Sequence, residues 1–73
     1  MTEVTKITIR NTFDAHIAAL DAFQLYQIKY LQVVQDDKIV FLAVLDIIEY
    51  QLIKRKLDEL VGVDFLSCKA INI

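Results

Sequence analysis

The sequence predicts one α+β domain, spanning residues 1–73, with the element order strand, helix, strand, strand, helix, strand. Residues 6–10 alternate strictly between polar and apolar side chains and are rich in β-branched residues, which is typical of a half-buried strand. Residues 39–45 form a continuous apolar run, and Asp46 and Glu49 then follow with the spacing of a helix capping box. One glycine and no proline indicate short loops and no linker between domains.

A first helix is predicted to follow the first strand and to end near Tyr26. Asn11 or Thr12 can cap its start, and Asp14 lies in the first turn, where the helix dipole favours a negative charge. The larger apolar side chains fall on one side, which we expect to face the core: Phe13, Ile17 and Leu20, with Gln24 in line and Phe23 on the flank. The opposite side carries Ala15, Ala18, Ala19 and Ala22, which would permit close helix packing but which the helix propensity of alanine explains equally well.

Residues 29–35 and 38–45 are predicted to form a β-hairpin joined by a two-residue turn, Asp36-Asp37. Counting outward from this turn pairs Gln35 with Lys38, Val34 with Ile39, Val33 with Val40, and Leu31 with Leu42. Because partners across a strand pair share a face, one face holds Leu31, Val33, Val40, Leu42 and Val44, which we assign to the core. The other face is then open and holds Tyr30, Gln32, Val34, Ile39, Phe41, Ala43 and Leu45.

The second helix is predicted to run from Asp46 to Gly62, because glycine tolerates the left-handed conformation that often ends a helix. Its apolar stripe consists of Tyr50, Ile53, Leu57, Leu60 and Val61. Residues 63–71 are predicted to form the last strand. In that strand we expect Leu66, Cys68 and Ala70 to point inward, and Phe65, Ser67, Lys69 and Ile71 to point outward.

This element order is that of the ferredoxin-like sandwich, in which two helices cover one face of a four-stranded antiparallel sheet. The alternative is a strand–helix–helix–strand chain with a long helical hairpin, because residues 11–61 contain neither glycine nor proline. The β-branched and aromatic residues Ile39, Val40 and Phe41 favour the sandwich over the hairpin, as does the cap at Asp46.

The composition indicates a small intracellular domain with surplus apolar surface. Hydrophobic residues make up 56% of the chain, above the roughly 45–50% of ordinary domains, so some of them must lie outside the core. The net charge of −2 argues against a strongly nucleic-acid-binding domain. The lone Cys68 and the lack of an apolar leader predict a cytoplasmic protein, and no run approaches the roughly 20 apolar residues of a membrane helix.

The lead functional hypothesis is a non-enzymatic protein-interaction or regulatory module that forms a homodimer and binds another protein. It follows from the open sheet face, since a large exposed apolar patch marks an interaction surface. The predicted anchors of the interface are Tyr30, Val34, Ile39 and Phe41. On the charged side of the second helix, Ile48 and Leu52 are explained either by the ordinary scatter of apolar surface residues or by a second contact with a partner.

The alternative hypothesis is a single-stranded nucleic-acid-binding module. Lys6, Arg10 and Lys69 would hold phosphates on the open face, while Tyr30, Phe41 or Phe65 would stack on bases. The aromatic and basic signature that RNA-recognition motifs carry on their third strand is absent from residues 38–45.

The sequence predicts no catalytic, metal or cofactor site. The only histidine, His16, is expected on the flank of the first helix, and the only cysteine, Cys68, is expected to point inward on the last strand, so a nucleophilic pair is not favoured. The ligand spacing of a zinc site is missing, and Gly62 alone makes no phosphate-binding loop.

Overall fold

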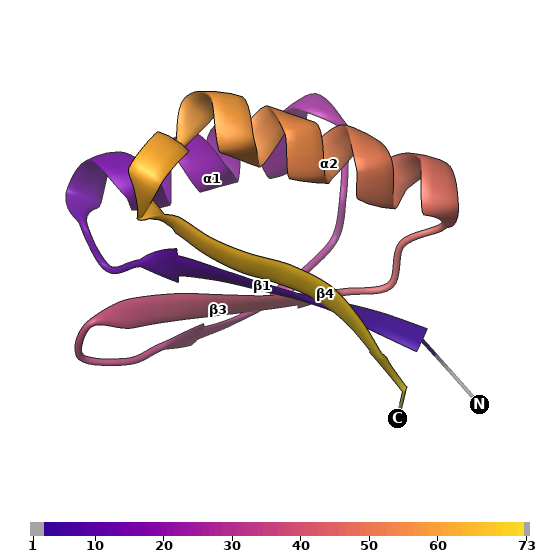
Figure 1. Ribbon diagram of the computed structural model, residues 1–73, viewed down its shortest axis with the longest axis horizontal. Coiled ribbons are helices and arrows are strands. Elements are labelled where there is room, and N and C mark those ends of the chain that lie inside the picture. Colours follow the sequence, from indigo (N-terminus) through magenta and orange to yellow (C-terminus); the bar gives the residue numbers. More distant parts are fainter. Residues whose placement is uncertain (1–2, 73) are drawn as a thin grey trace.

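The computed structural model describes residues 3–72, which form a two-layer sandwich (Figure 1). The elements are β1 (Glu3–Arg10), α1 (Phe13–Leu25), β2 (Leu31–Val34), β3 (Lys38–Ala43), α2 (Ile47–Leu60), a short 3₁₀ turn (Gly62–Asp64) and β4 (Phe65–Asn72). The strands form one antiparallel sheet in the order β2-β3-β1-β4, and both helices cover the same face of it. The predicted ferredoxin-like α+β fold is confirmed, and the helical-hairpin alternative is wrong.

The helix ends lie where the capping residues of the sequence placed them. The Thr12 hydroxyl accepts a hydrogen bond from the Ala15 backbone N–H (3.1 Å) at the start of α1. Asp46 and Glu49 form a complete capping box on α2, with hydrogen bonds of 2.7 and 3.1 Å. Gly62 has a φ of +67°, a conformation that costs glycine little and other residues more. The two N-terminal caps join residues three positions apart, so the sequence marks these helix starts locally.

The predicted register of the β2–β3 hairpin is confirmed, although both strands are shorter than expected. Leu31 pairs with Leu42, and the Gln35 N–H donates to the Lys38 carbonyl at 2.8 Å. The loop between β1 and α1 supports the turn, because the Asn11 side chain donates to the Gln35 carbonyl (3.0 Å). The Asn11 backbone N–H also donates to the Asp37 carbonyl (3.0 Å), so the turn is held from outside the hairpin.

The predicted assignment of the hairpin faces is wrong. Ile39 and Phe41 are fully buried under the helices rather than exposed on the open face. The reason is the pairing of β3 with β1, which aligns Ile39 with Ile9 and Phe41 with Ile7 on the buried side. The set predicted to be core, Leu31, Val33, Val40, Leu42 and Val44, therefore belongs to the open face, although Val40 is buried there as predicted.

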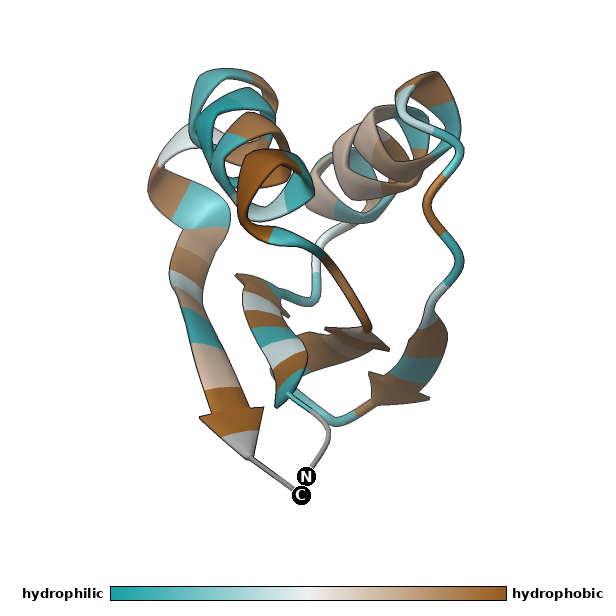
Figure 2. Ribbon diagram, turned by 90° about the vertical axis from the view of Figure 1, so that its right-hand side faces the viewer, coloured by the Kyte–Doolittle hydropathy of each residue, from teal (hydrophilic) through white to brown (hydrophobic). Residues whose placement is uncertain are grey.

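The predicted orientation of α1 is also wrong. Its buried residues are Ala15, Ala19, Ala22 and Phe23. Phe13 and Ile17, which were expected in the core, are 79% and 43% exposed. Large sheet residues such as Phe41 fill the space between the layers, so the helix side that meets them must be small. Figure 2 shows the two helices side by side above the sheet, with α1 on the β2 side and α2 on the β4 side.

The last strand begins two residues later than predicted, because the 3₁₀ turn occupies Gly62–Asp64. Cys68 aligns with Ile7 on the side that faces the helices, as predicted. Phe65 aligns with Ile9 on that same side, so its predicted outward orientation is wrong. A shift in the β1–β4 register between Thr8 and Ile9 interrupts the alternation of inward and outward side chains along β4. Leu66, which was expected to point inward, is 44% exposed.

Candidate protein-interaction surface

The most exposed apolar part of the sheet is its free edge, strand β2. All four residues of this strand are exposed, and its apolar residues are Leu31 (71%), Val33 (48%) and Val34 (56%). Leu31 and Val33 share the open face with Leu42 and Val40 of β3, whereas Val34 aligns with the buried Ile39 on the helix side. Strand β2 therefore has exposed side chains on both faces. We call Leu31, Val33, Val34, Leu42 and Val44 together the β2 surface.

The outer edge of β2 has backbone groups free to pair with another strand. Residues that exchange hydrogen bonds with a partner strand alternate with residues whose N–H and C=O point the other way. Because Gln35 bonds to Lys38, the backbone groups of Val33 also point to β3, and those of Gln32 and Val34 point outward. Exposed apolar edges are usually protected by charge or proline, and β2 contains neither.

The flank of α1 that overhangs β2 is apolar as well. The His16 ring bonds to the Gln32 side chain through Nε2 and Oε1 at 2.9 Å, which places this flank of α1 beside β2. Phe13 and Ile17, three residues before and one residue after His16, continue around the same flank. The exposed apolar strip therefore extends from the sheet edge onto the helix layer.

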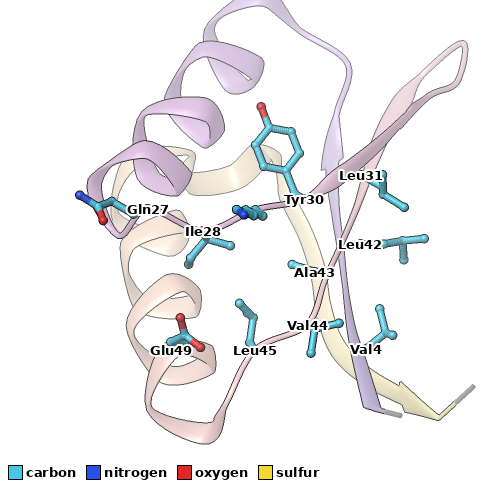
Figure 3. Close-up of a pocket in the computed structure, with 11 residues that line it drawn as sticks. Val4, Gln27, Ile28, Tyr30, Leu31, Leu42, Ala43, Val44, Leu45 and Glu49 are labelled. Atoms are coloured by element: carbon cyan, nitrogen blue, oxygen red, sulfur yellow. The ribbon is translucent and has the colours of Figure 1, made fainter.

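A hollow of about 590 Å³ lies where the chain passes from α1 into the start of β2, beside the end of β3 (Figure 3). Its walls are mostly apolar, and Lys29 and Glu49 are the charged residues among them. Ile28, Tyr30 and Leu45 line its helix side, and Val4, Leu31, Leu42 and Val44 line the open-face side. The hollow has room for an apolar side chain of a partner, and it continues the β2 surface at one end.

Of the four predicted interface anchors, two are exposed in the structure and two are buried. Tyr30 is 37% exposed, and its ring stacks on the buried Phe23 (4.8 Å) and meets Phe41 edge-on (5.4 Å), so one side of it covers the core. Val34 is exposed at the edge, whereas Ile39 and Phe41 are buried and cannot contact a partner. Those two predicted anchors are wrong because the sequence leaves the β1–β3 register open.

The predicted second contact lies in the other layer. Ile48 (66% exposed) and Leu52 (40%) are on α2, away from the β2 surface. The structure does not bring them together with β2. Leu31, Val33 and Leu42 belong to the candidate surface but are not among the predicted anchors, and the alternation of Lys6, Thr8 and Arg10 in β1 is the signal that marks their face.

The other half of the open face is basic. Lys6 lies between Leu42 and Lys69 in the register of the sheet, so two lysines are adjacent on this face. Arg10 forms an ion pair with Asp64 (3.3 Å). Phe65 and Phe41 lie on the helix side, so within residues 3–72 they cannot stack bases beside these lysines. The predicted stacking of bases on Phe41 and Phe65 is therefore wrong.

The side chains of Tyr50 and Cys68 both make contacts within the fold. Tyr50 donates its hydroxyl hydrogen to the Cys68 carbonyl (3.2 Å), and Cys68 lies beside Ile7 under the helices. Burial raises the pKa of the Cys68 thiol, which makes it a poor nucleophile at neutral pH. Within residues 3–72, no group of three or more metal-binding side chains comes together.

The raised pKa of Cys68 predicts a loss of stability in alkali. The unfolded chain gives up the thiol proton at lower pH than the folded chain, so stability is full below the ordinary thiol pKa of about 8.5 and falls above it. We expect urea denaturation to show a smaller alkaline loss for Cys68→Ala than for the natural chain. An equal loss of stability at alkaline pH in both proteins would show that Cys68 does not contribute to that loss.

The fold and this surface define a class: a ferredoxin-like α+β sandwich with an exposed apolar edge strand. No protein-family model, curated protein or solved structure matches the chain. Across residues 3–72, neither helix has the length and hydrophobicity needed to cross a membrane. The functional argument therefore depends on the geometry of the surface.

Proposed function

We propose that this domain is a non-enzymatic protein-interaction module that self-associates through the β2 surface and binds another protein on its open sheet face. The observation that carries the proposal is strand β2, which is exposed on both faces and is apolar at three of its four positions. An uncovered apolar edge of this kind favours pairing with another chain. The free thiol of Cys68 fits a reducing cytoplasm as its location.

The size of the domain supports self-association. A chain of 73 residues without a disulfide has a core that supplies only about 3–5 kcal/mol of net stability. Covering Leu31, Val33 and Val44 with a second copy would add burial that the monomer lacks. Natural small domains commonly gain stability in this way.

The charges of the open face indicate the chemistry of the second partner. Its apolar half lies on the hairpin, and its other half carries Lys6 and Lys69. A complementary protein would present an apolar patch bordered by acidic side chains, since complementary potentials favour association and exclude other partners.

Light scattering of the purified chain over a range of concentrations tests the self-association. We expect a mass approaching twice 8.4 kDa for the natural chain, and a monomer for Leu31→Glu, which places a charge on the β2 surface. Val63→Glu is the matched control, because Val63 is 93% exposed but lies in the 3₁₀ turn before β4, and this variant should remain dimeric. A natural chain that stays at 8.4 kDa at the highest concentration would refute self-association.

A further inference from the structure

We infer that β2 pairs antiparallel with β2 of a second copy, about a twofold axis at Val33, so that two four-stranded sheets join into one sheet of eight strands. The inference rests on the proposed self-association and specifies which atoms make it. Its basis is the free backbone edge of β2, the charges at the two ends of that strand, and the apolar flank of α1 above it.

The charges around β2 select the direction of pairing. The uncharged segment 30–35 has Lys29 before it and Asp36 and Asp37 after it. Antiparallel pairing brings Lys29 of each copy to the acidic turn of the other, and does so twice because of the symmetry. Parallel pairing would instead place Lys29 beside Lys29 and one acidic turn beside the other. Among the described residues the ion pairs are Arg10–Asp64 and Lys56–Glu59, so Lys29 and the turn remain available.

The hydrogen-bond pattern selects the register. Only residues whose backbone groups point outward, Gln32 and Val34, can bond to the second copy. Centring the pair on Val33 places Gln32 opposite Val34 of the second copy, and the two residues can exchange both N–H···O=C bonds. The same register places Lys29 opposite Asp37, so hydrogen bonding and charge agree on one arrangement.

This arrangement also accounts for the surrounding exposed residues. A twofold axis perpendicular to the sheet keeps both helix layers on one side, so the α1 flanks with Phe13 and Ile17 approach each other over the joined edges. On the opposite side, Leu31 and Val33 of the two copies merge into one apolar centre. Each copy's Lys6 and Lys69 border that centre, which leaves the open face accessible to the second partner.

The other free edge is less suited to pairing. Strand β4 carries Lys69 in its central part, and a charged residue on an edge strand opposes strand addition. Pairing of β2 with β4 of the next copy would also leave free edges and give chains of increasing length. A closed dimer therefore distinguishes β2–β2 pairing from this alternative.

The decisive variant is Val34→Pro, because it removes an N–H that points away from β3 and leaves the hairpin bonds intact. Circular dichroism should show a folded chain, and light scattering should show a dissociation constant raised by at least about tenfold. Val63→Glu, in the 3₁₀ turn and outside the β2 surface, is the control that should retain the dimer. Leu42→Glu places a charge on the open face of the β2 surface and leaves the edge backbone of β2 unchanged. A dimer that survives Val34→Pro but is lost in Leu42→Glu would overturn edge pairing and leave the proposed self-association standing.

Amide hydrogen exchange on the natural chain gives a second readout, which does not depend on the folding of a variant. The amides of Gln32 and Val34 should become protected as concentration rises through dimerisation, and the amide of Val33 should be protected at every concentration. Exchange at Gln32 and Val34 that does not change with concentration would refute the inference, as would a mass that continues to rise beyond the dimer.

Charge reversal tests the direction of pairing. Lys29→Asp should weaken the dimer about two- to thirtyfold, the range for losing two exposed ion pairs, and adding Asp37→Lys should restore it. Failure of the second change to restore binding would argue against antiparallel pairing at this register. A monomeric natural chain would remove both this inference and the self-association on which it rests.

Discussion

A Phe41→Asp variant is expected to be unfolded at 25 °C, with circular dichroism showing the loss of both helix and strand. Phe41 is fully buried, and its ring lies 4.9 Å from the ring of Phe23. Truncating a buried phenylalanine to alanine costs about 3–5 kcal/mol, and an unpaired buried charge adds further cost. A domain of this size has only about 3–5 kcal/mol of net stability, so the substitution exceeds it.

Leu31→Asp is the matched comparison, because it places the same charge on the neighbouring strand. Leu31 is 71% exposed on the open face, and surface substitutions usually change stability by no more than about 0.5 kcal/mol. Both variants should be compared at the same low protein concentration, where the natural chain is monomeric. A folded Phe41→Asp monomer would mean that Phe41 lies on the open face.

An Ala19→Leu variant is expected to lose about 1–3 kcal/mol, because α1 has no room for a larger side chain at its fully buried side. Ala19 belongs to the cluster that contains Phe23, Phe41 and Ile53. A leucine there must displace α1 from its neighbours or adopt a strained rotamer. Urea denaturation should show a lower midpoint with a nearly unchanged slope.

Phe13→Ala is the control on the opposite side of the same helix. Phe13 is 79% exposed, so removing its ring should change monomer stability by less than about 0.5 kcal/mol. If Ala19→Leu were neutral and Phe13→Ala cost several kcal/mol, the alanine side of α1 would face the solvent.

Local chemistry was sufficient to predict the order of elements, the caps and the hairpin register. Thr12, Asp46 and Gly62 act through their own turns, and the Asp36-Asp37 turn fixes its strand pair by counting. Such features depend on residues a few positions apart. Counting outward from the turn also predicts that both faces of the hairpin are apolar, and this excess of apolar surface is the basis of the candidate interaction surface.

The face that the helices cover could not be predicted from the hairpin alone. Both faces are apolar, and the choice depends on the register of β3 against β1, which are separated by a helix and a strand rather than by a tight turn. A shift of that register by one residue would exchange Phe41 with Leu42 between core and surface. Hydrophobicity does not distinguish these two residues.

The orientation of α1 was misjudged for a related reason. Its largest side chains suggested the core face, but the space under α1 is already filled by Ile39 and Phe41 of the sheet. Only alanines allow the helix to approach a layer filled in this way. Side-chain size along one helix says little about how much space the opposite layer leaves.

The sequence by itself determined the fold and the excess of apolar surface, because caps, turns and alternation act over a few residues. The tertiary structure decided where that excess lies, because the alignment of distant strands selects which apolar residues are buried. That alignment leaves Leu31, Val33 and Val34 exposed at the free edge. Among residues 3–72, β2 is the last strand at its end of the sheet, and this position makes its edge a candidate for pairing with a second chain.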